Sequence, residues 1–315
     1  MSKSAIEPVL ASFPNPFFRY FAATRPAFLV ATLAGCLIGL TGAIYSGVSF
    51  QPVTAGLTVL LALLVHAGVN VLNDYYDALN GTDAINTERL YPFTGGSRFI
   101  QNGVLTTTQT AYFGYLLLSV AIIGGLWLSW QVGPGLLAIG AVGVLIGWAY
   151  SATPLHLNSQ GLGELCVLIG FIGIVEGADY VQRKAFSLQP LMLGMPYALL
   201  VTNLLYINQF PDRKADATVG KRHLVVRLPL SKAVLVYPIL AGLALVWLAS
   251  LVAMGKLPIV TMLSALPVLF SARASWILRK FYAQPAHLLS AIRLTLASML
   301  GHALLLVLIM LWKTL

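Results

Sequence analysis

Residues 53–77 read VTAGLTVLLALLVHAGVNVLNDYYD, an apolar run that ends in an asparagine and two aspartates. A helix needs roughly 20 apolar residues to cross a membrane, and residues 53–73 supply them. The run does not alternate apolar and polar residues, which excludes a strand of a transmembrane barrel. The stretch therefore predicts a membrane-spanning helix that carries acidic side chains to one surface of the bilayer.

The composition extends this interpretation to the whole chain. Of its 315 residues, 58% are hydrophobic and 9% are charged, and the mean hydropathy is +0.83. Soluble domains are about one quarter charged and disordered chains have low hydrophobicity, so both classes are excluded. The two cysteines, Cys36 and Cys166, fall within apolar runs and are too few for a disulfide scaffold. What remains is a protein that crosses the membrane several times.

Nine apolar segments are long enough to span a bilayer. We therefore predict an all-α fold with nine transmembrane helices. The predicted spans are residues 26–46, 53–73, 110–130, 133–150, 162–182, 190–209, 232–254, 257–277 and 290–312.

The basic residues predict the orientation of the chain. With nine spans, 15 of the 19 Lys and Arg residues fall on the side that holds the N-terminus. The other side holds Arg183, Lys184, Lys256 and Lys313. Because short cytoplasmic loops are enriched in Lys and Arg, we predict a cytoplasmic N-terminus.

The net charge of +9 does not indicate a nucleic-acid partner. Basic residues are not interleaved with aromatic residues as on a nucleic-acid surface. Membrane topology and the anionic headgroups of lipids account for the charge. Membrane lipid is thus the expected partner, and the oligomeric state stays open.

The chain divides into a short leader and one large domain. Residues 1–25 lack the continuous apolar core of a signal peptide, so we expect a cytoplasmic or interfacial segment. Residues 26–315 form a single transmembrane domain. Its longer connections, about 78–109 and 210–231, both face the cytoplasm, and long loops in compact domains are usually functional or disordered.

Five of the ten carboxylates lie in two short segments that open these connections: Asp74, Asp77 and Asp83 in the first, and Asp212 and Asp216 in the second. At the end of the second span, Asn73 and Asp77 form an Asn-x-x-x-Asp motif. At the end of the sixth span, the motif is Asn-x-x-x-Asp-x-x-x-Asp, formed by Asn208, Asp212 and Asp216. This recurrence after four spans predicts two pseudo-repeated four-helix units plus a ninth helix.

Residues four apart lie on one face of a helix, so each motif predicts a stripe of oxygen ligands. Pro211 lies within the second stripe and can kink that helix, because proline has no backbone N–H to donate. Oxygen ligands without His or Cys suit a hard cation, and Mg²⁺ completes its shell with water and substrate phosphate. Two facing stripes would hold Mg²⁺ against one diphosphate group. A single acidic residue at a helix end is more often a cap, but five in two like-spaced motifs favour the metal site.

Basic residues beside the stripes fit an anionic substrate. Lys221 and Arg222 follow the second stripe, and Arg98 follows the first, after Gly95 and Gly96. Cations there would neutralise diphosphate oxygens, and glycines let backbone amides approach an anion. The alternative for Arg98 is a role in topology alone.

These motifs resemble the UbiA-type intramembrane prenyltransferase family, which carries Asn-Asp-x-x-Asp after span 2 and Asp-x-x-x-Asp after span 6. The sequence is most similar to the 1,4-dihydroxy-2-naphthoate polyprenyltransferase (menaquinone-pathway) branch, through the stretches 73–83 and 208–228, together with Tyr150-Ser151 and Arg25-Pro26. It departs from the family at Gly81, where many members have a further Asp, at His156 and Asn158, where the family often has a lysine nearby, and at Pro229, where the family has Gly.

The resemblance implies Mg²⁺-dependent transfer of a polyprenyl group from its diphosphate to an aromatic acceptor, in a bacterial inner membrane with the active site on the cytoplasmic side. The implied catalytic residues are Asp74, Asp77, Asp212 and Asp216. The implied diphosphate-binding residues are Arg98, Tyr150, Lys221 and Arg222. The implied metal ligands are Asn73, Asp77, Asp83, Asn208, Asp212 and Asp216.

Three other functions stay open from the sequence. The acceptor could be of the 4-hydroxybenzoate or homogentisate type, because the residues that read the aromatic ring vary most between branches of the family. A terpene cyclase on the same scaffold would consume the diphosphate without an acceptor. An ion-coupled transporter would use intramembrane acids, but it predicts carboxylates near the bilayer midplane, whereas these cluster at one surface.

Overall fold

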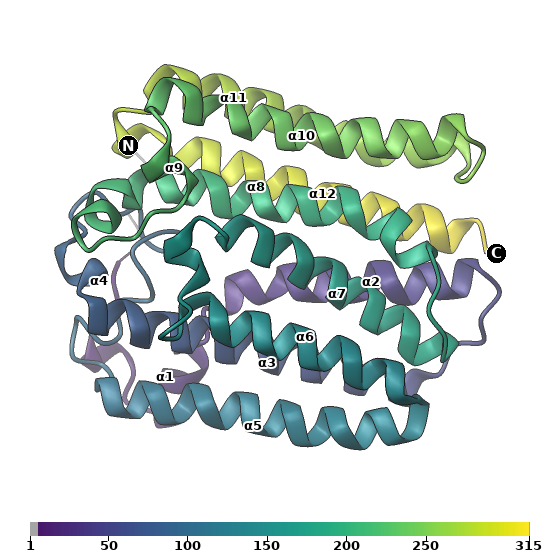
Figure 1. Cartoon of the computed structure of the whole chain (residues 1–315), viewed down its shortest axis with the longest axis horizontal. Helices are drawn as coiled ribbons and strands as arrows, with labels where there is room; N and C mark the ends of the chain where they lie inside the picture. Colours follow the sequence, from purple (N-terminus) through teal and green to yellow (C-terminus); the bar gives the residue numbers. More distant parts are fainter. Residues whose placement is uncertain (1–5, 315) are drawn as a thin grey trace.

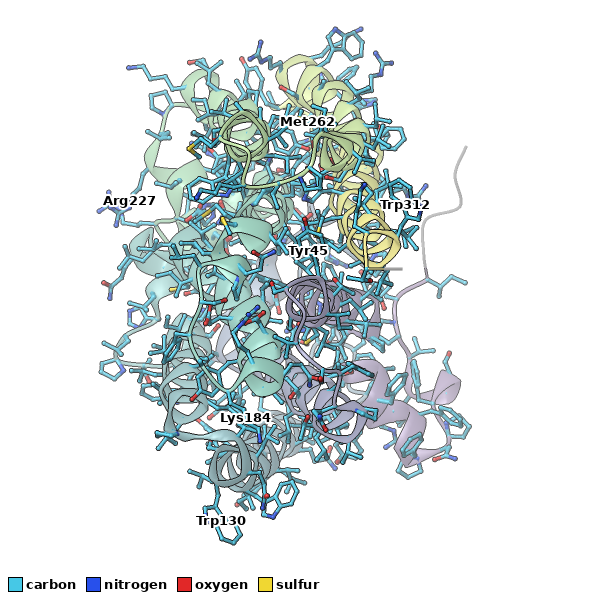
Figure 2. The ribbon with its side chains drawn as sticks, turned by 90° about the vertical axis from the view of Figure 1, so that its right-hand side faces the viewer. Tyr45, Trp130, Lys184, Arg227, Met262 and Trp312 are labelled. Atoms are coloured by element: carbon cyan, nitrogen blue, oxygen red, sulfur yellow. The ribbon has the colours of Figure 1, made fainter. Side chains whose placement is uncertain are left out.

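A computed structural model describes residues 6–314, and within that range the chain is helical with no strand. Long helices lie side by side in a bundle, as Figure 1 shows from the side and Figure 2 shows from one end. The predicted all-α fold is confirmed. Residues 1–5 of the predicted leader and residue 315 lie outside the described range.

The long helices coincide with the predicted spans, with ends shifted by several residues. They are α2 (Pro26–Tyr45), α3 (Pro52–Asn80), α5 (Thr107–Val132), α6 (Pro134–Ser151), α7 (Gly163–Arg183), α8 (Gln189–Thr218), α10 (Leu230–Ala253), the continuous pair η3 (Ile259–Val268) and α11 (Leu269–Phe281), and α12 (Leu289–Trp312).

Eight of these segments are long and apolar enough to cross a membrane. The other one, α7, was predicted as the fifth span and is helical, but it contains Glu164, Glu176, Asp179 and Arg183. It lies inside the bundle, where it packs against α2, α6 and α8. The integral membrane bundle is therefore established, and the count of nine spans and the two pseudo-repeats stay predictions.

Short elements gather at one end of the bundle, on the left in Figure 1. They are η1 (Leu10–Ser12), α1 (Pro16–Ala23), α4 (Thr82–Ile85), η2 (Leu157–Gln160), α9 (Leu224–Arg227) and η4 (Pro285–His287). Both acidic motifs lie at this end, because α3 and α8 finish there. The expected loops are shorter than predicted, since α3 continues to Asn80 and α8 to Thr218.

Proline marks the start of several helices, where its missing N–H costs nothing. Pro26, Pro52 and Pro134 are the first residues of α2, α3 and α6. Pro211 lies inside α8, and the helix continues past it. The second acidic stripe therefore stays on one helix, despite the hydrogen bond that Pro211 cannot donate.

The largest apolar core joins α2, α7, α8, α10 and α12. Helix α2 approaches α7 most closely at Gly39, where an added Cβ would lie 2.2 Å from the carbonyl oxygen of Val175 and 2.8 Å from the Cβ of Ala178. Such a contact with backbone cannot relax by side-chain rotation. Gly39 thus lets two helices on one wall of the bundle touch.

We expect Gly39→Ala to destabilise the bundle by about 1–3 kcal/mol, the range for overpacked interiors, because α2 and α7 must separate. The thermal midpoint of the purified protein in detergent would fall. Gly56→Ala in α3 is the matched control, since its Cβ would meet nothing within 4 Å. An equal midpoint for the two variants would contradict the close crossing.

Candidate active site

A cavity of about 1230 Å³ lies between α3, α6, α7 and α8. Its mouth is lined by the polar residues of both acidic motifs, and its deeper part by apolar side chains. Along α3 the lining extends from Asp77 to Thr58, which is about 28 Å at 1.5 Å per residue. The cavity thus runs from the polar end of the bundle through most of a bilayer's hydrocarbon thickness.

The first motif presents two residues to the cavity from one face of α3. The Nδ2 of Asn73 donates to Asp77 Oδ2 at 3.2 Å and to Ser151 Oγ at 2.9 Å. Asn80 Nδ2 donates to Asp77 Oδ1 at 3.2 Å. These amides orient the carboxylate of Asp77, which lines the cavity.

The second motif lies on α8, and Asn208, Asp212 and Asp216 all line the cavity. Side chains from the segment after α3 hold two of them across the mouth. Thr82 Oγ1 donates to Asp216 Oδ1 at 2.8 Å, and Asn86 Nδ2 donates to Asp212 Oδ1 at 2.6 Å. The two acidic motifs therefore face each other, as their spacing predicts.

Lys221 connects the two motifs. Its Nζ lies 2.6 Å from Asp77 Oδ1 and 3.4 Å from Asp216 Oδ1. Burial disfavours the charged amine, but Asp77 and Asp216 raise the pKa of Lys221 above its ordinary value, so it stays charged. His223 Nε2 lies 3.2 Å from Asp216 Oδ2 on the other side. A buried cation thus already occupies the space between carboxylates of α3 and α8.

Asp83 reaches the cavity from α4, beside a tight glycine loop. Gly96 has φ +71°, and a Cβ there would lie 2.4 Å from Asp83 Oδ2. The neighbouring amide of Ser97 donates to Asp74 Oδ1 at 3.1 Å. Glycine is needed at this position both for its backbone and for room beside the carboxylate.

Three residues named by the sequence do not line the cavity. Asp74 is buried and anchors the Gly96–Ser97 loop. Arg98 is buried and donates to the backbone carbonyl of Asp83. Arg222 is exposed, and its backbone amide donates to Ser159 O at 2.8 Å. The structure brings the other predicted residues together at the cavity, Tyr150 and Lys221 among them.

The donor set fits a hard divalent cation. Asp83 Oδ2 and Asn208 Oδ1 are buried oxygens that have no hydrogen-bond partner in the described part of the chain. Within residues 6–314, no three His, Cys, Asp or Glu side chains form a ready-made metal cluster. The carboxylates and amides of both motifs nevertheless supply oxygen ligands of the kind that Mg²⁺ prefers.

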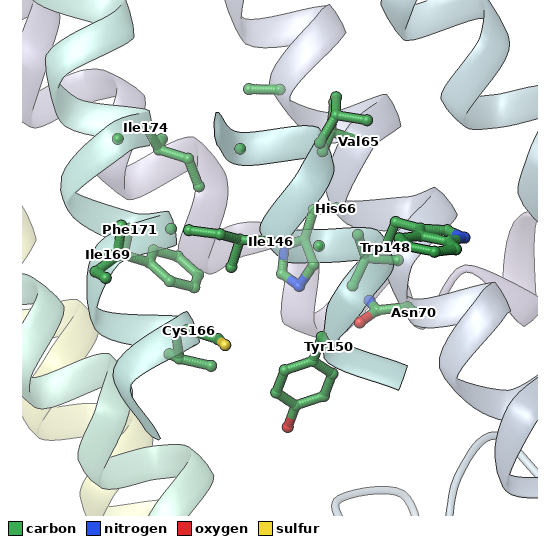
Figure 3. Close-up of a pocket in the computed structure, with 18 of the residues that line it drawn as sticks. Val65, His66, Asn70, Ile146, Trp148, Tyr150, Cys166, Ile169, Phe171 and Ile174 are labelled. Carbon is green, nitrogen blue, oxygen red and sulfur yellow. The ribbon is translucent and has the colours of Figure 1, made fainter. Parts of the chain in front are cut away.

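The deeper part of the cavity is apolar and aromatic. Figure 3 shows His66 of α3, Tyr150 of α6 and Phe171 of α7 arranged around a common space. Thr32 Oγ1 lies 2.7 Å from His66 Nδ1. The rings of His66 and Phe171 pack edge to face, with their centroids 6.0 Å apart. This part of the cavity can hold an apolar chain and exclude water.

Several residues that line the cavity are not predicted from the sequence. Thr82, Asn86 and His223 orient the acids, and Arg25 lines the cavity beside them. The sequence singles out Arg25 only through its resemblance to the family at Arg25-Pro26. Thr82 and Asn86 lie close to Asp83 in the sequence, and this proximity to a predicted metal ligand is the one feature that could have identified them.

A helical membrane bundle with an oxygen-lined mouth above an apolar chamber fits an intramembrane enzyme. Residues 28–299 match the UbiA prenyltransferase family, and the chain belongs to that family. It is thus a UbiA-type prenyltransferase, and the transporter alternative is set aside.

Curated relatives include 1,4-dihydroxy-2-naphthoate octaprenyltransferases of two bacteria. The chain is 26% identical to the Bacillus subtilis (strain 168) protein over 245 residues, which cover 74% of this chain and 73% of the relative. It is 29% identical to the Mycobacterium tuberculosis protein over 234 residues, which cover 72% of this chain and 76% of the relative.

The solved structure of a UbiA homolog from Archaeoglobus fulgidus bound to DMAPP and Mg²⁺ has the same fold. Its TM-score is 0.65 at 15% identity, and the match covers 92% of this chain and 99% of the other.

The environment of Asp83 predicts pH-dependent cation binding. Burial, followed by the charges of Asp77 and Asp74, raises the pKa of Asp83 to about 8. A carboxyl must lose its proton to ligate a metal, so protons compete below that pH. We expect Mg²⁺ affinity, measured by calorimetry in detergent, to rise with pH up to about 8, by up to about tenfold per pH unit.

Asp83→Asn would remove this dependence, because the amide does not titrate. If the variant keeps the full pH dependence, a different group competes with the cation.

Proposed function

We propose that this enzyme transfers a polyprenyl group from its diphosphate to 1,4-dihydroxy-2-naphthoate in menaquinone biosynthesis, with Mg²⁺ as cofactor. The observation that carries the proposal is the pair of facing acidic stripes at the mouth of an apolar cavity. The acceptor is inferred from the curated relatives, whose names specify it. The Mg²⁺ and prenyl diphosphate in the Archaeoglobus neighbour support the cofactor and the donor class.

The metal would be held by oxygens of both motifs and of α4. These are Asn73, Asp77, Asp83, Asn208, Asp212 and Asp216, all of which line the cavity. Bound there, Mg²⁺ would neutralise the diphosphate and stabilise its negative charge as it leaves.

Lys221 and Tyr150 are the groups best placed to bind the diphosphate directly. Both line the cavity at the mouth, and Lys221 brings a positive charge between the motifs. With Asp77 and Asp216 as ligands of a divalent cation, the Lys221 ammonium would be available to pair with a diphosphate oxygen. The Tyr150 hydroxyl can donate a hydrogen bond to the same group. Arg98 and Arg222 stay predictions for this role, as does Asp74 for catalysis.

The apolar chamber would hold the polyprenyl chain and protect the reacting carbon. An allylic cation is stabilised by aromatic faces and destroyed by water. Phe171 supplies such a face, and the aliphatic side chains of α6 and α7 exclude water. The electron-rich ring of the acceptor then attacks the cation and loses a proton or, in the naphthoate branch, carbon dioxide.

The proposed setting is the bacterial inner membrane, with the acidic end of the bundle in the cytoplasm. The excess of Lys and Arg on the side of the acidic motifs supports this orientation.

We expect Asp77→Ala and Asp212→Ala to abolish prenyl transfer while the protein still inserts and folds. Each variant removes one carboxylate ligand from one stripe. The diphosphate charge is then left uncompensated, which costs several orders of magnitude in rate. The measurement is Mg²⁺-dependent release of diphosphate by the purified enzyme in detergent, with a thermal unfolding scan for each variant.

Glu88→Gln is the control for these variants, because Glu88 pairs with the exposed Lys214 and does not line the cavity. Near-normal turnover of either alanine variant at saturating Mg²⁺ would refute the metal assignment.

The acceptor is tested with a panel of aromatic compounds and several prenyl diphosphates, read by mass spectrometry. We expect prenylated product from 1,4-dihydroxy-2-naphthoate. Product only from 4-hydroxybenzoate or homogentisate would assign the enzyme to another branch of the family. Diphosphate release without any acceptor would indicate a cyclase.

A further inference from the structure

The carboxylate of Glu7 lies at the centre of a polar cluster behind the acidic mouth. Its Oε1 accepts from Nε of Arg89 at 2.7 Å, and its Oε2 accepts from Nδ2 of Asn102 at 3.2 Å. The Nε of Arg98 lies 3.7 Å from Oε2. None of these four residues lines the cavity, so direct contact with a substrate there does not explain the cluster.

Both arginines hold the backbone of the segment that closes the mouth. Arg89 Nη1 donates to the carbonyl of Asn86 at 2.6 Å, and Arg98 Nη1 donates to the carbonyl of Asp83. The side chains of Asp83 and Asn86 line the cavity, and Asn86 holds Asp212 of the opposite motif. One carboxylate thus orients two guanidinium groups, each of which fixes one residue of the site.

The arrangement depends on a negative charge at this place. Two guanidinium groups near each other repel, and Glu7 lies within reach of both. Partial burial opposes ionisation, but hydrogen bonds from Asn102 and Arg89 hold the pKa of Glu7 below its ordinary value. Arg98 also has φ +67°, an uncommon conformation for a side chain other than glycine, which its contacts must maintain.

The segment that carries Glu7 is itself fixed to the bundle. Phe13 packs on Phe99, with ring centroids 5.2 Å apart, in a small cluster with Ala23 and Leu105. Nδ2 of Asn102 also donates to the carbonyl oxygen of Pro8 at 2.9 Å, so the segment that carries Glu7 contacts the loop of residues 89–102 at Phe99 and Asn102.

We propose that Glu7 is a positioning residue for the Mg²⁺–diphosphate site. Through Arg89 and Arg98 it fixes the backbone of residues 83–86, and so it sets where Asp83 and Asn86 face the opposite motif. The inference rests on the proposed function, since it assigns the N-terminal segment a role in the cation affinity of that same site.

The test compares Glu7→Gln, Glu7→Asp and Glu88→Gln with the unchanged protein. For Glu7→Gln we expect the Mg²⁺ concentration at half-maximal activity to rise roughly fivefold, the upper end for a partly exposed ion pair. The kcat at saturating Mg²⁺ and the thermal midpoint stay unchanged. Glu7→Asp keeps the charge and restores most of the affinity. Glu88→Gln leaves the Mg²⁺ dependence as it is, because its partner Lys214 is exposed and Glu88 holds no other side chain of the loop.

Hydrogen exchange gives a readout that does not need activity. We expect amides of residues 83–102 to exchange faster in Glu7→Gln than in the unchanged protein or in Glu88→Gln. Unchanged Mg²⁺ half-saturation would overturn the inference, and so would a lowered thermal midpoint as the only effect. If the unchanged protein shows no Mg²⁺-dependent transfer, the proposed function fails, and the exchange experiment still decides whether Glu7 holds the loop.

Discussion

The structure depends on how four carboxylates, three of them buried and one half-buried, are accommodated side by side at the end of an apolar bundle. Asp77, Asp83, Asp212 and Asp216 all line one cavity mouth, and the bilayer around it is a poor solvent for charge. Two unit charges 4 Å apart interact by about 4 kcal/mol at an effective dielectric constant of 20. Lys221 offsets this repulsion by contacting two of the acids, and amide and hydroxyl donors orient the rest. The same repulsion favours a bound cation, so under the proposed function stability and catalysis depend on one interaction.

Much of this architecture could be predicted because membranes restrict sequences strongly. A helix in lipid must be apolar for about 20 residues, so each span is visible in the chain. The four-residue spacing of Asn73 with Asp77, and of Asp212 with Asp216, placed each pair on one helix face, and α3 and α8 have these faces toward the cavity. The sequence did not show that α7 lies inside the bundle, because its three acidic residues lower its mean hydropathy but do not interrupt the helix.

The residues that orient the acids were harder to predict, because their partners are distant in sequence. Asn86 contacts Asp212 across 126 positions, and Thr82 contacts Asp216 across 134. No spacing rule links such pairs. The positions of Arg98 and Arg222 show the same limit, since a basic residue beside an acidic motif can face substrate, backbone or solvent. Only the packed structure separates these cases.

The depth of the cavity also bears on how the substrate reaches the enzyme. Its lining extends along α3 over about 28 Å, from the polar mouth at Asp77 to Thr58, and the apolar part lies at the level of the lipid tails. A long isoprenoid is held in the membrane by about 0.8 kcal/mol per methylene, so extraction into water would be very slow. A chamber at this level lets the isoprenoid bind without leaving the membrane. The search for substrate then becomes diffusion in two dimensions, and the rate of encounter is set by surface density in the membrane and not by concentration in the cytoplasm.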